Sequence, residues 1–126
     1  MSRRFAGHLG VRGPDAPLLQ HMAGSADPVD QIALMADLRF AGVFDNYLLL
    51  RDEADQDRIG MELRRHGMAM GSFVHDPLRW DQPAWIDGSA LASLDRTMAA
   101  AVRTGAASVT CITAGMGDPA QDRRSM

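Results

Sequence analysis

Three helix-length segments of this chain are each followed by a short apolar run, and this alternation constrains the fold more than any other feature. The segments with helical spacing cover residues 28–41, 52–66 and 90–104. Strand-like runs follow at residues 43–45, 68–75 and 107–113, and another such run opens the chain at residues 5–11. Strands that alternate with helices predict right-handed crossovers and a parallel sheet covered by helices.

The first helix has a clear start signal in the pair Asp27-Pro28. An Asp side chain can cap the free N–H groups of a helix, and Pro fits the first helical position because its missing N–H costs nothing there. Ile32, Met35 and Leu38 recur at helical spacing. We therefore expect these three side chains to form the buried face of the helix.

The two later helices show the same organisation. Asp52 or Asp55 can cap the second, and Gly60 in its middle either weakens the helix or permits close packing. Each helix closes on an arginine followed by a glycine turn. The predicted buried side of the second helix is Ile59 and Leu63, and that of the third is Leu91, Leu94, Met98, Ala101 and Val102.

Length and composition exclude several classes of function. A chain of 126 residues predicts a single domain over residues 1–126. The formal net charge of −3 gives no basic surface for nucleic acid or an anionic membrane. Cys111 is the sole cysteine and lies in an apolar run, so we expect a small core residue and a reducing, cytoplasmic location. No signal peptide and no run of membrane-spanning length is recognisable.

Two architectures fit the alternation: a small doubly wound sheet, or part of a (β/α)8 barrel. A dinucleotide-binding sheet normally carries a glycine-rich turn that leads from its first strand directly into a helix. Here residues 10–13 lead into a long connection that contains Pro14 and Pro17, so this fingerprint is missing. No phosphate-binding P-loop is present either.

The order of four motifs resembles the first half of the xylose-isomerase-like barrel superfamily, which includes sugar isomerases, epimerases and hydroxypyruvate isomerase. The motifs are Phe5-Ala6-Gly7-His8-Leu9, Ala41-Gly42-Val43-Phe44-Asp45, Arg65-His66-Gly67-Met68 and Ile112-Thr113-Ala114-Gly115. The resemblance spans nearly the whole chain from Phe5. The fold that it implies is an α/β fold of parallel βα repeats, a (β/α)4 half of a TIM-type barrel.

The resemblance implies isomerisation or epimerisation of a sugar or hydroxy-keto acid by metal-assisted proton transfer next to a carbonyl. Members of the superfamily are about twice as long, and their metal ligands and acid–base glutamates lie mainly on later strands. A Mg²⁺ or Mn²⁺ ion is therefore implied, but no ligand for it is visible in this chain. The alternative is a non-catalytic half-barrel, or a flavodoxin-like module for binding or assembly.

In such barrels the functional residues lie at the carboxyl ends of the strands. Four side chains are predicted there as substrate-binding: His8, Asp45, His75 and Trp80. Each has a structural alternative: a core histidine for His8, a hydrogen-bonded corner for Asp45, a satisfied strand-end histidine for His75, and loop packing for Trp80. Replacing His75 with Ala is expected to weaken substrate affinity without unfolding the protein, unless His75 belongs to the core.

A four-unit half-barrel has two open strand edges and an uncovered core face, both of which invite pairing. These open edges predict either a homodimer or pairing with a missing second half. The resemblance to the superfamily implies a small-molecule carbohydrate or keto acid as the ligand.

Overall fold

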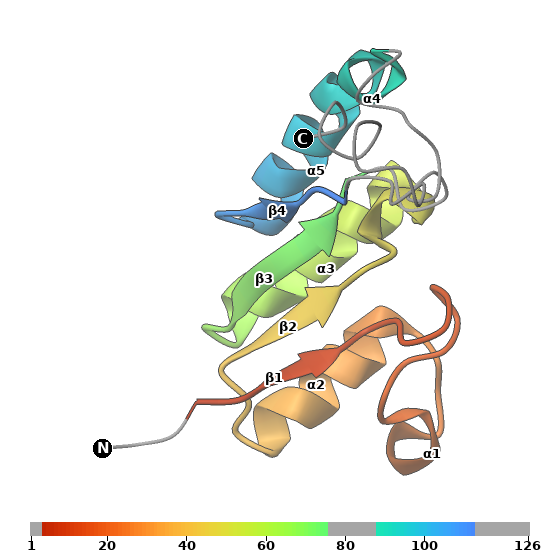
Figure 1. The fold of residues 1–126 in the computed structure, drawn as a ribbon. Helices are drawn as coiled ribbons and strands as arrows, with labels where there is room; N and C mark the ends of the chain where they lie inside the picture. The colour runs from red at the N-terminus through yellow and green to blue at the C-terminus, as the bar shows by residue number, and fades with distance from the viewer. Residues whose placement is uncertain (1–3, 76–87, 113–126) are drawn as a thin grey trace.

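The computed structural model describes residues 4–75 and 88–112, and these form one parallel sheet with helices packed on it (Figure 1). The sheet has four strands in the order β1-β2-β3-β4, so each strand pairs with its neighbour in sequence. The strands are β1 (Ala6–His8), β2 (Gly42–Asp45), β3 (Ala69–Val74) and β4 (Val109–Thr110).

The pairing register fixes which residues stand side by side across the sheet. Ala6 pairs with Gly42, and Gly42 pairs with Ala69, so these three mark one level near the amino ends of the strands. His8 pairs with Phe44. Between β2 and β3 the register shifts, because Val43 pairs with Met70 whereas Asp45 pairs with Phe73. The shift inserts one extra residue into β3 at Gly71 and Ser72.

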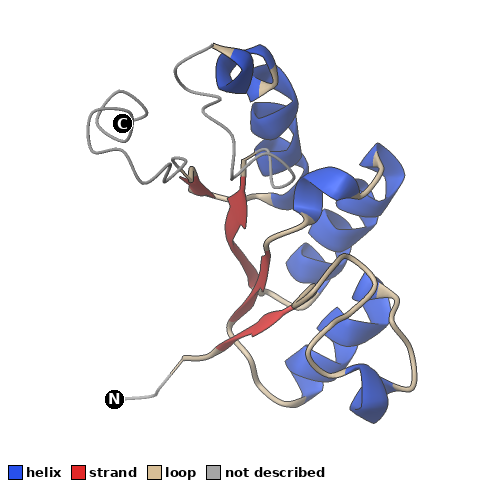
Figure 2. Cartoon of the chain, turned by 45° about the vertical axis from the view of Figure 1, so that its right-hand side comes forward, coloured by secondary structure: helices blue, strands red, loops and turns tan. Residues whose placement is uncertain are grey.

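All the described helices lie on one face of the sheet, which Figure 2 shows nearly edge-on. The helices are α1 (Gln20–Ala23), α2 (Pro28–Asp37), the 3₁₀ turn η1 (Leu48–Leu50), α3 (Glu53–Arg65), α4 (Ser89–Ala92) and α5 (Leu94–Thr104). In the layer α2 contacts α3, and α3 contacts α5. The α1 helix contacts α2 at the end of the layer beyond β1 (Figure 1).

This arrangement confirms the predicted α/β fold of parallel βα repeats and is consistent with a (β/α)4 half-barrel. A doubly wound sheet reverses its strand order at a switch point and therefore carries helices on both faces. The four described strands show no reversal, and their helices share one face. Continuous strand order is the arrangement of a β/α barrel.

The helix starts follow the predicted capping chemistry. The Asp27 side chain accepts a hydrogen bond from the N–H of Val29 at 2.9 Å, with Pro28 at the first helical position. Arg58 on α3 donates to Asp27 and holds the pKa of that carboxyl below its usual value. The contact thus contributes stability above the unfolded-state pKa of Asp27, and that stability is lost as the pH falls through the lowered folded-state pKa.

The core lies between the sheet and the α2–α3–α5 layer. Its largest fully buried side chain is Phe73 on β3. The predicted core residues Ile32, Met35, Ile59 and Leu63 are all buried. Other members of the cluster are Leu9, Val43, Leu48, Leu49, Met68, Met70 and Ala100.

Several local predictions were wrong. Leu38 is 44% exposed because the chain leaves α2 just before it, at Asp37. Cys111 is exposed at the end of β4, so it is not a core residue. The helix predicted at 90–104 is broken at Ser93 into α4 and α5, and α1 lies inside a segment predicted to be a loop. After α2 the left-handed conformation is taken by Arg39, with φ of 63°, and not by a glycine.

The largest error concerns the third helix. Leu91, Leu94, Met98 and Val102 were predicted to be buried, and all four are exposed. The residues that α5 buries are Thr97, Ala100 and Thr104. Helical spacing correctly identified an apolar stripe, but this stripe faces away from the core of the described residues.

Gly60 permits the close approach of α3 and α5. A Cβ atom at this position would overlap the backbone carbonyl of Arg103 on α5. Of the two readings of Gly60 from the sequence, close packing is therefore the one that the structure supports.

We predict that Gly60→Ala destabilises the fold although alanine is the better helix former. The gain in helix propensity is about 1 kcal/mol, whereas overpacking against backbone that cannot rotate away costs more, so we expect a net loss of about 2 kcal/mol. Chemical denaturation measures it. Gly13→Ala is the matched control, because a Cβ at Gly13 meets nothing within 4 Å. Equal stability of Gly60→Ala and wild type would contradict the α3–α5 contact.

Candidate functional site

The carboxyl ends of β1, β2 and β3 bring three of the four predicted site residues to one end of the sheet. His8 ends β1, Asp45 ends β2, and His75 follows the last residue of β3. Trp80 lies outside the described residues. The three described side chains do not share a face of the sheet, and this separates their roles.

His8 lies on the face of the sheet opposite to the helices, which is called here the bare face because no described helix covers it. Its neighbour Gly7 faces the helices, because a Cβ there would meet Met35 and Phe40. The His8 ring lies 5.8 Å from the Phe44 ring on β2, centroid to centroid. Its Nδ1 atom is buried without a hydrogen-bond partner. An unsatisfied buried nitrogen costs about 1–3 kcal/mol, so His8 has an unmet hydrogen-bonding need on this face of the sheet.

Asp45 points the other way, into the helical layer, and is fully buried. One carboxylate oxygen accepts a hydrogen bond from Nε of Arg51 at 2.6 Å, and the other accepts from the N–H of Tyr47 at 3.2 Å. Arg51 also donates to the carbonyl of Leu9, at 3.3 Å, in the loop after β1. The pair therefore ties together the connections that leave β1 and β2. Both oxygens of Asp45 have partners inside the protein.

His75 also faces the helices. The residue is 4% exposed, and its Nδ1 lies 2.5 Å from the hydroxyl oxygen of Thr97 on α5. Its backbone N–H donates to the carbonyl of Thr110 on β4. These contacts favour the satisfied strand-end histidine, which was the structural alternative for this position.

The bare face carries a second polar group that the sequence analysis did not predict. The hydroxyl oxygens of Ser72 on β3 and Thr110 on β4 lie 2.5 Å apart. Ser72 belongs to the extra residues of β3, and a bulge alters the facing of side chains in a way that strict alternation does not predict. His8, Phe44, Ser72 and Thr110 thus form a row across four neighbouring strands, called here the interior row.

Two hollows are found elsewhere on the described residues. One, of about 400 Å³, lies on the bare face near the amino ends of the strands and is apolar. Its lining residues are Arg4, Phe5, Ala6, Ala41, Gly42, Val43, Phe44, Ala69 and Gly71. It contains Phe44 but neither His8 nor Ser72, so it adjoins the interior row without enclosing it.

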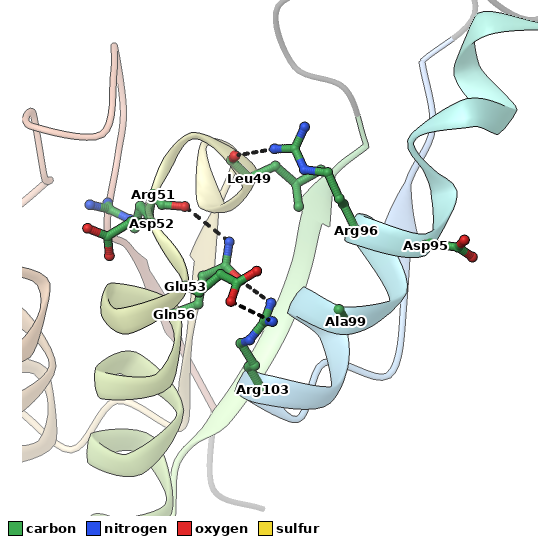
Figure 3. Close-up of a pocket in the computed structure, with 9 residues that line it drawn as sticks. All are labelled: Leu49, Arg51, Asp52, Glu53, Gln56, Asp95, Arg96, Ala99 and Arg103. Atoms are coloured by element: carbon green, nitrogen blue, oxygen red, sulfur yellow. Dashed lines mark hydrogen bonds and ion pairs between the residues drawn. The ribbon is translucent and has the colours of Figure 1, made fainter.

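The other hollow, of about 480 Å³, lies between α3 and α5 (Figure 3). Arg96 and Arg103 flank it on α5, with the small Ala99 between them. Arg103 donates to Gln56 at 3.0 Å and pairs with Glu53 at 3.3 Å. Arg103 is thus balanced by acidic and amide groups, whereas Arg96 donates to the carbonyl of Leu49 at 3.4 Å. We regard the hollow as a polar seam between two helices.

The implied divalent metal has no visible site in the described part of the chain. Among residues 4–75 and 88–112, no group of three or more His, Cys, Asp or Glu side chains could hold a metal ion. Both oxygens of Asp45, the carboxylate predicted at the second strand, already accept hydrogen bonds, one from Arg51 and one from the N–H of Tyr47. The residues described here therefore do not fit the ion.

Comparisons with protein-family models, with curated proteins and with solved structures found no match for this chain. In the described part of the chain, no helix has both the length and the apolar character needed to cross a membrane.

We predict that Asp45→Asn destabilises the fold by about 3 kcal/mol, because removing one partner of a buried ion pair leaves the other charge uncompensated. Urea denaturation measures the loss. Asn keeps the shape of the side chain, so the effect reports charge. Asp55→Asn is the control, because the Asp55–Arg58 pair is exposed, and exposed pairs contribute about 0–1 kcal/mol. Equal losses in the two variants would contradict a special role for the Asp45–Arg51 pair.

The contacts of His75 predict that His75→Ala lowers the free energy of unfolding by about 1–3 kcal/mol. The variant loses the packing of the imidazole and its hydrogen bond with the Thr97 hydroxyl, although that hydroxyl keeps its hydrogen bond to the carbonyl of Ser93. Thermal unfolding followed by circular dichroism checks this. His66→Ala provides the control, because His66 is exposed and contacts only the neighbouring turn, at Glu62. A His75→Ala protein as stable as wild type would return His75 to the list of ligand-binding candidates.

Proposed function

We propose that this chain is the first half of a β/α-barrel isomerase or epimerase acting on a sugar or hydroxy-keto acid. Its ligand lies over the interior row at the carboxyl end of the sheet. The observation that carries the proposal is the buried, unpartnered Nδ1 of His8 on the bare face, beside the Phe44 ring. The continuous strand order supports it, because in a barrel this face becomes the interior.

The chemistry of the row suits a small polyhydroxy or hydroxy-keto ligand. An imidazole and two hydroxyl groups can donate and accept hydrogen bonds to carbonyl and hydroxyl oxygens. His8 and Ser72 are two strands apart, roughly 10 Å. This distance matches the length of one small open-chain sugar with the hydrogen bonds that its end groups make. The Phe44 ring between them offers an apolar surface for the carbon skeleton.

Isomerisation next to a carbonyl moves a proton between neighbouring carbons and therefore needs a base. The interior-facing positions of the described strands hold no carboxylate, since Asp45 faces the helices. The base and the Mg²⁺ or Mn²⁺ ligands would come from residues outside the described ranges or from another chain. Trp80 remains a proposed ligand contact, and a cytoplasmic location remains part of the proposal.

Asp45 and His75 take positioning roles in this proposal. Asp45 fixes the loops after β1 and β2 through Arg51, and His75 joins β3 to α5. Both roles hold the strand ends that present the interior row.

A second candidate function is a non-catalytic assembly module. One observation favours it: the carboxylate of Asp45 and the imidazole of His75, both predicted for the site, turn away from the bare face. What remains on that face can bind polar ligands or another protein without performing proton transfer.

The test is proton exchange in D₂O, because isomerisation through proton transfer replaces the hydrogen next to the carbonyl with deuterium. A ketopentose, a ketohexose and a three-carbon hydroxy-keto acid are incubated with the protein and Mg²⁺ or Mn²⁺, and proton NMR follows the signal. We predict that His8→Ala lowers the exchange rate at least about tenfold. His66→Ala, at the exposed carboxyl end of α3, should leave it unchanged.

The stability of the His8→Ala protein separates binding from folding. His8→Ala removes an unsatisfied nitrogen but also the ring that packs beside Phe44, so thermal unfolding of the variant is measured alongside exchange and must show a folded protein. Absence of exchange with every probe in the wild-type protein would reject the isomerase and leave the assembly module.

A further inference from the structure

The helix α5 has three distinct sides, and one of them has no partner among the described residues. Successive helical residues are turned by about 100°. Thr97, Ala100 and Thr104 face the sheet, whereas Arg96, Ala99 and Arg103 line the seam with α3. The third side, away from α3, carries Leu94, Met98 and Val102, which are 39%, 56% and 79% exposed.

Leu91 on α4, the short helix that precedes α5, is also exposed. We call Leu91, Leu94, Met98 and Val102 the α5 stripe. In a layer of helices on a parallel sheet, each inner helix has one neighbour on either side. The α5 stripe lies where the next helix of the layer would pack.

The opposite end of the same layer also exposes apolar side chains. The α1 helix lies beyond α2, past the β1 edge of the sheet (Figure 1). Leu18, just before α1, and Met22 within it are 55% and 63% exposed. The two edge strands are also available for pairing, because β1 and β4 each pair with only one described strand.

We propose that two copies of this chain join head to tail, each β4 edge and α5 stripe receiving the β1 edge and α1 surface of the other copy. This inference rests on the proposed function, because it supplies the partner that closes the barrel. A twofold axis parallel to the strands leaves all strands parallel. It therefore makes two identical junctions and a closed ring of eight strands, which is the strand number of a β/α barrel.

The available surface is large enough for such a dimer. The exposed apolar side chains at the two ends are the α5 stripe, Leu18, Met22, Ile112 and Phe5. Weighted by their exposure, at about 100 Å² for a whole side chain, they offer on the order of 500 Å² of apolar surface per copy. Apolar atoms form about 60% of an interface, so this corresponds to about 800 Å² per copy, the size of a standard interface.

The test is solution mass by light scattering over a range of protein concentrations. We expect a dimer for the wild type. Met98→Glu and Met22→Glu should each weaken the dimer at least about tenfold, because a charge enters an apolar contact at both junctions. Met61→Glu is the matched control: Met61 is 64% exposed on α3, in the middle of the layer, and its substitution should change nothing.

A charge pair distinguishes this junction from other dimers. If Met98 of one copy faces α1 of the other, the double variant Met98→Glu, Met22→Lys should regain the dimer, because opposite charges meet at both junctions. Three outcomes would overturn the proposal: a monomer at every concentration, a dimer insensitive to both single variants, or a dimer lost with Met98→Glu only. The last would indicate two stripes packed against each other.

The same samples separate this inference from the proposed function. A head-to-tail dimer without proton exchange supports the assembly and rejects the isomerase. Proton exchange by a stable monomer rejects the assembly and supports the isomerase. Thermal unfolding of each variant verifies that it folds, and all three substituted methionines are exposed. A fall in solution mass without a loss of fold therefore shows that the junction between the copies is broken.

Discussion

A parallel sheet exposes backbone and side chains on two faces, and parallel sheets in proteins normally have both faces covered. Here the continuous strand order sends every right-handed crossover to the same side. The helical layer buries Val43, Met70 and Phe73, and on the described strands the opposite face carries small residues together with His8, Phe44 and Val74. Covering the second face of the described sheet requires curvature into a barrel, a partner, or residues outside the described ranges. The bare face, the open edges and the α5 stripe all follow from this one constraint.

The buried Asp45–Arg51 pair shows how the carboxyl end of the sheet is held in place. Arg51 lies six residues after Asp45 and reaches both the carboxylate and the carbonyl of Leu9. Desolvation makes such a pair a weak source of stability, but breaking it is costly, so it favours one arrangement of the two loops over others. The loop after β1 is in this way fixed next to His8, whose own carbonyl accepts the N–H of Leu18 at 3.2 Å.

The sequence predicted the elements well because their signals are local. Asp27-Pro28, Asp52 and the apolar pairs Ile32–Met35 and Ile59–Leu63 each act within a few residues of themselves, and the structure bears them out. The direction in which each side chain faces was predicted less well. Helical spacing reveals that Leu94, Met98 and Val102 share a side of α5, but not which neighbour covers that side. The carboxylate of Asp45 was assigned to a ligand because it ends a strand, and nothing local in the sequence shows that Arg51 turns back onto it.

The candidate site was only partly predictable for the same reason. His8 was predicted from its place on the first strand, and regular alternation puts it on the face opposite to Gly7. Ser72 was not predicted, because the extra residue in β3 breaks the alternation. His75 sits beyond that irregularity and faces Thr97, so its position at a strand end said little about its side. Because of this single register shift, the bare face carries the hydroxyl of Ser72, which was not predicted, and not the imidazole of His75, which was.

The proposed dimer carries a consequence for the stoichiometry of the site. Two interior rows related by a twofold axis face each other across one barrel, each with its own His8. A sugar or hydroxy-keto acid has no twofold symmetry, so one bound molecule contacts the two rows differently. The interior of an eight-stranded barrel is only wide enough for side chains or one small ligand. One ligand per two chains is therefore the stoichiometry that this geometry requires, and the two identical imidazoles would take different roles toward that one molecule.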